Sequence, residues 1–310
     1  MKIGTDSENL LSETAVVCGQ SKGIGIHGIA SVVNSLAASG GKCLGVEVQI
    51  TIPEYAYKSR IRTMEKIMKN TCKEQGIELT GVKGVQSPVV NIPVVTVTGI
   101  ARAPKDEPWC LETGRAGQDV VLTGWAGMDG MVRIADEREQ ELRKRFAPAF
   151  MKQILSYREK IFALKEIDVA KAVGVSAVRQ ITEGGILAAL WNLAKEADTG
   201  LELDMRKLSV LQETIEVCEH YRLNPYQLTS VGSLLMVTDD GEALADALRR
   251  EQVEASVIGR MTDNNDKMLH NGEEVRYIDR PAPDEIMKIY SKGAEDGRYQ
   301  ETDIEVSGEE

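Results

Sequence analysis

The chain has 310 residues, of which 42% are hydrophobic, and a formal net charge of −11. This length predicts about two domains with a sizeable core, and the acidic balance excludes a general nucleic-acid binder, which presents a basic surface. Five scattered cysteines without a C-x-x-C pair favour reduced thiols and a cytoplasmic protein over a disulfide or zinc framework. No apolar run approaches the roughly 20 residues of a membrane helix, and the polar residues 1–13 do not resemble a signal peptide.

The first part of the chain alternates strand and helix patterns. In chain order, we predict a strand at 14–18, a helix at 29–38, a strand at 43–52, a helix at 59–75, and strands at 77–80 and 89–100. In the second of these strands apolar and polar residues alternate, which indicates one face that is wet or faces a partner. A loop with two prolines follows at 103–117, and we place a domain boundary near residue 113.

The second part carries more helix. In chain order, we predict a strand at 119–123, helices at 131–145, 148–162 and 165–173, a strand at 173–178, a helix at 186–197, a strand at 201–203, a helix at 212–222, a strand at 234–238, a helix at 241–251 and a strand at 255–260. The whole pattern is α+β. It predicts an N-terminal α+β domain at 1–113, a C-terminal α/β domain at 114–284 and an acidic, disordered tail at 285–310.

The stretch 180–185 (QITEGG) joins a predicted strand to a predicted helix. Thr182 stands where a helix N-cap would lie, and Gly184 and Gly185 would leave the first backbone N–H groups of the helix unobstructed. A bare helix N-terminus can hold an anion. The alternative interpretation is a glycine-rich turn that packs against a sheet.

A second glycine-rich stretch, residues 23–28, matches G-x-G-x-x-G between a strand and a helix, with Glu47 near the position of a ribose-binding acid. This would indicate a nicotinamide-dependent oxidoreductase. However, Glu47 lies within an alternating strand, whereas buried parallel strands of a dinucleotide fold read as continuous apolar runs. We therefore favour a flexible glycine loop.

No metal site is predicted. The three histidines lie far apart without metal-ligand spacing. The acidic run 263–266 lacks the glycine and terminal glutamate of an EF-hand loop, so we interpret it as a solvated turn.

Several blocks in a fixed order resemble the aminoimidazole ribonucleotide (AIR) synthase superfamily, and in particular the branch that holds the hydrogenase-maturation carbamoyl dehydratase. The blocks are ITEGGILAALW at 181–191, GLELD at 200–204, LNPY at 223–226 and SVGSLL at 230–235, with weaker counterparts NSLAASG at 34–40 and VVNIPVV at 89–95.

The resemblance implies an N-terminal domain whose sheet pairs with a second subunit into a barrel, and a C-terminal α/β domain beside it. It also implies that ATP and Mg²⁺ bind in a cleft near the dimer interface, where they activate an oxygen by phosphorylation. It assigns no catalytic residue in this chain. The ligand-binding residues that it implies are Thr182, Glu183, Gly184, Gly185, Asn34, Gly81 and Lys83.

The sequence departs from the family pattern where the family has acids. The family's Thr-Asp-Pro stands here as Cys-Gly-Gln at 18–20, its Asn-Asp as Asn34-Ser35, its Gly-Gly-His-Thr-Glu as GVKGV at 81–85, and its aspartate before Thr-Glu-Gly-Gly as Gln180. The paired aspartates expected before residue 14 and the C-terminal Pro-Arg-(Ile/Val)-Cys are also absent from this sequence. Magnesium held through carboxylates would therefore have too few ligands.

Three cations, Lys22, Lys83 and Arg179, offer direct binding of an anion without metal, although they can equally be solvated. We therefore predict a cytoplasmic pseudoenzyme without ATP or Mg²⁺ that forms a homodimer, or a heterodimer with an active paralogue. It would bind a phosphate-bearing small molecule, and neither nucleic acid nor membrane. The alternative is an active, ATP-dependent enzyme of the carbamoyl dehydratase type.

Overall fold

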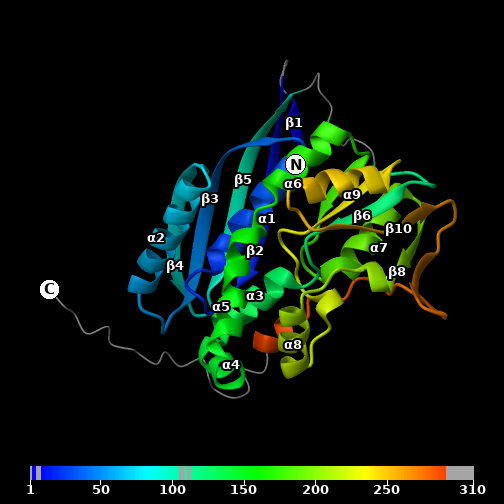
Figure 1. The fold of residues 1–310 in the computed structure, drawn as a ribbon. Helices are drawn as coiled ribbons and strands as arrows, with labels where there is room; N and C mark the ends of the chain where they lie inside the picture. The colour runs from blue at the N-terminus through cyan, green and yellow to red at the C-terminus, as the bar shows by residue number, and fades with distance from the viewer. Residues whose placement is uncertain (1, 5–7, 105–108, 110–112, 291–310) are drawn as a thin grey trace.

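The computed structural model describes residues 2–4, 8–104, 109 and 113–290. Its first part forms a five-stranded sheet with the strand order β1-β2-β5-β3-β4, in which only the β3–β4 pair is parallel (Figure 1). The strands are β1 (Lys2–Gly4), β2 (Glu8–Cys18), β3 (Lys42–Pro53), β4 (Leu79–Ser87) and β5 (Val94–Pro104).

One face of this sheet is covered by helices α1 (Ile24–Ala38) and α2 (Ser59–Glu74), as Figure 1 shows. The alternation in β3 sets the two faces: Val46, Val48 and Ile50 are buried under the helices, while Glu47 and Gln49 point to the uncovered side and are exposed. The apolar side chains of β3 are buried on one face only. The second face therefore remains accessible to solvent or to a partner.

The second part forms a seven-stranded sheet with the order β12-β11-β8-β10-β6-β9-β7. Its strands are β6 (Asp119–Thr123), β7 (Ala177–Gln180), β8 (Gly200–Asp204), β9 (Leu234–Thr238), β10 (Ala255–Thr262), β11 (Lys267–Asn271) and β12 (Glu274–Tyr277). Its helices are α3 (Met128–Glu137), α4 (Glu139–Arg145), α5 (Pro148–Ser156), α6 (Leu164–Val173), α7 (Gly185–Ala197), α8 (Gln212–Tyr221) and α9 (Gly241–Arg250).

Strand β6 shows how both faces of the second sheet are buried. Val120 and Leu122 pack with α7 on one face, whereas Val121 packs with α6 and α9 on the other. A strand that is covered on both sides reads as a continuous apolar run. The prediction of an α+β chain is confirmed by this architecture. The division into domains at residue 113 stays a prediction.

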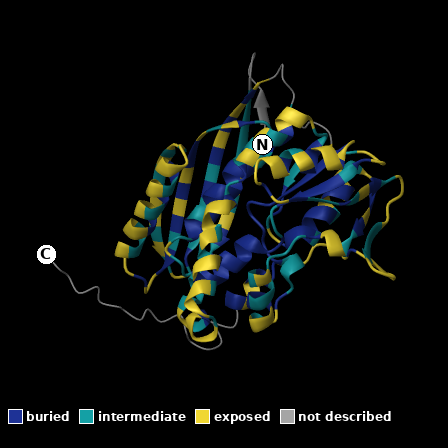
Figure 2. Ribbon diagram, in the orientation of Figure 1, coloured by how far each residue is buried: buried dark blue, intermediate teal, exposed yellow. Residues whose placement is uncertain are grey.

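Helix α1 is the element between the two sheets. It contacts β2 and β5 of the first sheet and β7 of the second (Figure 1). Most of its residues are buried, as the dark blue ribbon in Figure 2 shows. A helix that is apolar nearly all round needs cover on opposite sides. No helix in the described part of the chain is both long and apolar enough to cross a membrane.

Several strand predictions were wrong in their limits. The strand at 14–18 begins at Glu8, and the strand at 173–178 runs instead from Ala177 to Gln180. The strand at 77–80 continues as β4 to Ser87, and the strand at 89–100 begins only at Val94, because Val89 lies in an exposed turn. The glycines of β4 hid the strand pattern. One of them permits a close approach of α2: a Cβ at Gly84 would lie 2.3 Å from Cγ2 of Ile61.

Two helix predictions and the start of the tail are also corrected. The helix at 131–145 is interrupted at Arg138, whose guanidinium donates to the carbonyl oxygen of Ile289, and the helix at 148–162 becomes a 3₁₀ turn from residue 157. The predicted tail at 285–310 is wrong for 285–290, because Ile286 and Ile289 belong to the core cluster around α3. Residues 291–310 lie outside the described residues.

We expect Gly99→Ala to destabilise the protein by about 1–3 kcal/mol, because overpacking strains a dense core. An added Cβ would lie 2.4 Å from Cγ1 of Val32 and 2.9 Å from Cδ1 of Leu36 on α1. Urea unfolding measures the change. Gly81→Ala is the control in the same sheet, since its Cβ would meet nothing closer than 3.9 Å. Equal stability of the two variants would contradict the packing of α1 on β5.

Candidate functional site

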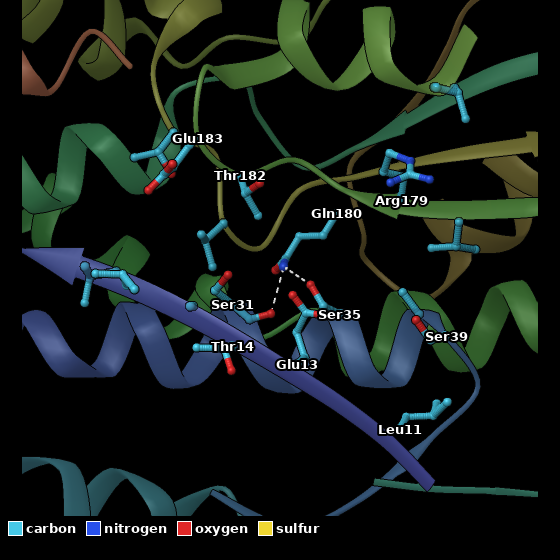
Figure 3. A pocket seen from close by; sticks show the side chains of 18 of the residues that line it. Leu11, Glu13, Thr14, Ser31, Ser35, Ser39, Arg179, Gln180, Thr182 and Glu183 are labelled. Atoms are coloured by element: carbon cyan, nitrogen blue, oxygen red, sulfur yellow. Dashed lines mark hydrogen bonds between the residues drawn. The ribbon is translucent and has the colours of Figure 1, made fainter. Parts of the chain in front are cut away.

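A cleft of about 800 Å³ opens between the two parts of the chain. Its walls come from β2, α1, β7 and the loop that follows β7 (Figure 3). The side chains of Ser31 and Ser35 on α1 face Gln180 at the end of β7, while Thr182 and Glu183 line the cleft beyond them. Volume and lining fit a small-molecule site.

The amide of Gln180 is the polar centre of this cleft. Its Nε2 donates to the carbonyl oxygen of Ser31 and to Oγ of Ser35, both at 2.8 Å (Figure 3). The two positions at which the family pattern has aspartates, 35 and 180, are therefore in direct contact, and a neutral hydroxyl–amide pair occupies them.

Asn34, which we predicted to bind ligand, is engaged elsewhere. It is fully buried, and its Nδ2 donates to Oε1 of Gln180 and to the carbonyl oxygen of Ile161, both at 2.8 Å. Its Oδ1 accepts from the backbone N–H of Ala163 at 2.9 Å. These bonds make Asn34 a structural link between α1 and the second part of the chain.

The N-terminus of α7 differs from the prediction at Thr182. The structure places the N-cap at Gly184, without a side-chain cap, and Thr182 instead offers its carbonyl oxygen to the N–H of Gly185. Gly184 and Gly185 both have positive φ, +76° and +66°, and a Cβ at Gly185 would lie 2.5 Å from the carbonyl oxygen of Tyr226. Glycine is needed here because an L side chain fits neither the backbone nor the space.

A carboxylate of the chain itself occupies this helix end. Oδ2 of Asp284 accepts from the N–H of Gly184 at 2.9 Å, and Oδ1 accepts from the N–H of Ile286 at 2.9 Å. Burial raises the pKa of Asp284 to about 6, although these two bonds and nearby Arg133 favour its charged form. The α7 N-terminus is thus bonded internally, as the turn interpretation expects.

The second glycine-rich stretch, residues 23–28, is not the flexible loop that we predicted, because helix α1 begins at Ile24 and not at residue 29. The residues just before this helix are bonded to a carboxylate, as Gly184 is. The N–H groups of Gln20 and Ser21 donate to the two carboxylate oxygens of Glu137 on α3, at 2.8 and 2.9 Å. Burial raises the pKa of Glu137, which these bonds oppose. Glu47 lies on the uncovered face of the first sheet. The loop and this acid therefore do not form a dinucleotide site together.

A buried charged cluster lies beneath the cleft. Nδ1 of His27 on α1 lies 2.5 Å from Oδ1 of Asp129 on α3, and Oγ1 of Thr229 donates to Oδ2 of the same carboxylate at 3.0 Å. Burial raises the pKa of Asp129, but the charge and hydrogen bond of His27 outweigh this and lower it. Arg133, 3.9 Å from Asp129, reaches the lining of the cleft and donates to the carbonyl oxygen of Cys18.

The two remaining residues that we predicted to bind a ligand do not lie at the cleft. Gly81 and Lys83 lie on β4, at the opposite edge of the first sheet from the cleft. Arg179 lines the cleft but pairs with Glu196. Among the described residues, no three His, Cys, Asp or Glu side chains gather to hold a metal ion.

Sequence reasoning missed Ser31, Arg133, Glu137 and Asp284. Each acts through a partner about 100 residues or more away in the chain, as the bond from Gly184 to Asp284 does. No local spacing signals such contacts. Only Asp284 could have been noticed from the sequence, because it stands two residues before the apolar Ile286. An acid that is buried beside an apolar residue needs a hydrogen-bond donor.

A family model described as AIR synthase related protein, C-terminal domain, matches residues 115–270. The chain belongs to this family. It is 23% identical over 276 residues to a putative hydrogenase expression/formation protein of Methanocaldococcus jannaschii, covering 86% of this chain and 78% of that protein. It is 26% identical over 243 residues to the carbamoyl dehydratase HypE of Rhodobacter capsulatus, covering 76% of this chain and 69% of that protein.

The crystal structure of Escherichia coli HypE superposes with a TM-score of 0.73 at 20% identity, covering 90% of this chain and 88% of that one. This shows that the two proteins share the AIR synthase-like fold.

Asp284 predicts a pH dependence of stability for this AIR synthase-related protein. Its folded pKa of about 6 lies above the ordinary value of 3.8, so the folded state holds its proton more tightly than the unfolded state. The free energy of unfolding should therefore fall as pH rises from about 4 to 6, by roughly 2 kcal/mol. Asp284→Asn lacks this titration, so the difference between wild type and variant should follow that fall. Urea unfolding at several pH values measures it, and a difference that stays constant from pH 4 to 7 would contradict the prediction.

Proposed function

We propose that this protein keeps the AIR synthase-related fold without ATP- and Mg²⁺-dependent catalysis, and acts as a dimeric ligand-binding or scaffold protein. The observation that carries the proposal is the contact between Gln180 and Ser35 in the cleft. In the family pattern both positions are acidic. In this structure the two side chains at these positions face each other at hydrogen-bond distance.

Two carboxylates in this arrangement would provide oxygen ligands for a divalent cation, which Mg²⁺ requires. The pair found here does not fit that role. Gln180 turns its N–H₂ group toward Ser35, and both of its hydrogens are used in hydrogen bonds. An amide donor at this point repels a cation, and positions 35 and 180 themselves offer it only neutral oxygens.

The two glycine-rich segments support the same proposal. A phosphate would need free N–H groups at a helix N-terminus. Here the N–H of Gly184, the N-cap of α7, is bonded to Asp284, and those of Gln20 and Ser21, in the segment just before α1, are bonded to Glu137. A nucleotide phosphate would have to displace a buried carboxylate at either place.

The cleft itself still supports binding of a small molecule. Arg133 and Thr182 supply a cation and a hydroxyl for a phosphate-bearing ligand, whereas Glu13 and Glu183 add negative charge to the walls. This combination favours one phosphate group over a triphosphate, because each further negative charge meets these acids. The phosphate would bind directly, without a bridging metal.

The uncovered face of the first sheet supports a dimer, either of two copies or with an active paralogue. Val16 on β2 and Ile100 on β5 lie on this face and are 52% and 49% exposed. Apolar side chains that remain exposed together usually mark a protein interface. A barrel made from two such sheets would cover them.

An active ATP-dependent enzyme is the second candidate. The relatives named carbamoyl dehydratase favour it, and Glu13 and Glu183 are carboxylates on the walls of the same cleft. It requires that these two acids replace the neutral positions 35 and 180 as metal ligands.

We expect calorimetry to show no tight, Mg²⁺-dependent ATP binding and expect no ATPase turnover, because the facing positions 35 and 180 carry no carboxylates. Ser35→Asp/Gln180→Asp is the comparison variant. It restores two facing acids, so Mg²⁺ should raise its melting temperature while leaving that of the wild type unchanged. Steady ATP turnover by the wild type, with or without an added amide substrate, would establish the second candidate instead.

We expect light scattering at micromolar concentration to give twice the mass of one chain. Val16→Arg/Ile100→Arg should yield monomers, because burying two unpaired guanidinium groups in the interface is unfavourable. Val275→Arg is the matched control, since Val275 is 51% exposed on β12, far from that face. A monomeric wild type counts against the dimer.

A further inference from the structure

Helix α2 carries a row of basic side chains along one side. They are Lys58, Arg62, Lys66, Lys69 and Lys73. The steps between them are four, four, three and four residues, which keeps them on one side of an α-helix. All five are exposed, and α2 forms the outer layer over β3 and β4 at the left of the molecule (Figures 1 and 2). We call this row the α2 basic stripe.

The orientation of the stripe is fixed by packing. The opposite part of the helix surface buries Met64, Met68 and Cys72 against the first sheet and the start of α1. Rotation of α2 would expose these three side chains, so the cations are held outward. At 1.5 Å per residue the stripe is about 22 Å long.

None of the five cations has an ion pair or a side-chain hydrogen bond within the described residues. Some exposed cations elsewhere are paired: Arg143 bonds Glu139, Arg249 bonds Asp246, and Arg260 bonds Asp119. Like charges three or four residues apart destabilise a helix. In a chain with a net charge of −11, five cations along one side of a single helix are a local excess of positive charge.

Two aromatic side chains stand at the N-terminal end of the stripe. Tyr55 and Tyr57 are 53% and 58% exposed, directly before Lys58. Tyrosine rings supply contact area at low entropic cost and often anchor protein interfaces. They give the stripe a short-range contact in addition to its charge.

We propose that the α2 basic stripe docks an acidic segment of a partner protein. The charge is complementary: the row holds five cations and one acid, Glu65, which lies three residues after Arg62 and four before Lys69. This excess of positive charge matches a short segment with several carboxylates. A nucleic acid needs a broad basic surface, and the acidic remainder of this chain would repel a longer polyanion. This docking surface is separate from the cleft and does not depend on its chemistry.

The test uses the full chain and a fluorescein-labelled decaglutamate peptide, with fluorescence anisotropy at low and physiological salt. The variant Arg62→Glu/Lys66→Glu/Lys69→Glu should bind the peptide at least about tenfold more weakly, because three charge contacts become repulsive. Lys144→Glu/Lys152→Glu/Lys207→Glu is the control. It changes the net charge equally at three exposed lysines outside α2, and its affinity should stay within about twofold of wild type. Circular dichroism checks the fold of both variants. If the first variant does not fold, Arg62→Gln/Lys66→Gln/Lys69→Gln takes its place.

Three results would overturn the proposal. The first is no binding by the wild type, or equal weakening in both variants, which would indicate non-specific attraction. The second is tighter binding of a ten-nucleotide single strand or of anionic lipid vesicles through the same three residues. The third is a tenfold gain in affinity when the chain is ended after residue 290, because residues 291–310, with seven acidic and two basic residues, would then be the occupant.

Discussion

The amide of Gln180 and the amide of Asn34 join helix α1 to the second part of the chain, and the position of the cleft depends on them. Gln180 bonds Ser31, Ser35 and Asn34, while Asn34 also bonds the backbone at Ile161 and Ala163. Both side chains are buried, so each unmade bond would be costly. A fully satisfied polar network of this kind permits one arrangement of the surrounding elements, because any shift of α1 would break several bonds together.

Under the proposed function, the same contact would allow the fold to persist without a metal ion. Two facing acids, at the half-buried position 35 and the buried position 180, would repel each other unless a cation lay between them. A neutral hydroxyl and an amide need no cation, since the amide donates and the hydroxyl accepts. The exchange therefore removes both the attraction for a divalent ion and the structural need for it. Retained apolar positions and lost carboxylates are compatible because they belong to different parts of the free energy, namely packing and charge.

The sequence predicted what depends on local pattern. The alternation in β3 and the apolar runs of β6 and β9 gave the sheets, and family-like blocks gave the architecture. Local patterns did not predict the features that depend on a contact with a residue far away in the sequence. The break at Arg138 depends on a carbonyl near the C-terminal end, the burial of Ile286 depends on the core around α3, and β4 was hidden by glycines, one of which α2 requires. For the site, the neutral positions were visible in the sequence, but their mutual contact was not, since 145 residues separate Ser35 from Gln180.

Asp284 and Glu137 connect these observations. A buried carboxylate is expensive, as the raised pKa of each shows, and it is retained only where it bonds donors that would otherwise be unmet. Each bonds backbone N–H groups of a glycine-rich segment next to a helix. A bound phosphate would satisfy the same donors, so a protein that relied on a phosphate ligand at these segments would gain nothing from a permanent internal acid. Two such acids at two separate segments therefore agree with the proposed function, because an ATP-dependent enzyme that bound phosphate at these segments would have to displace both of them in each cycle.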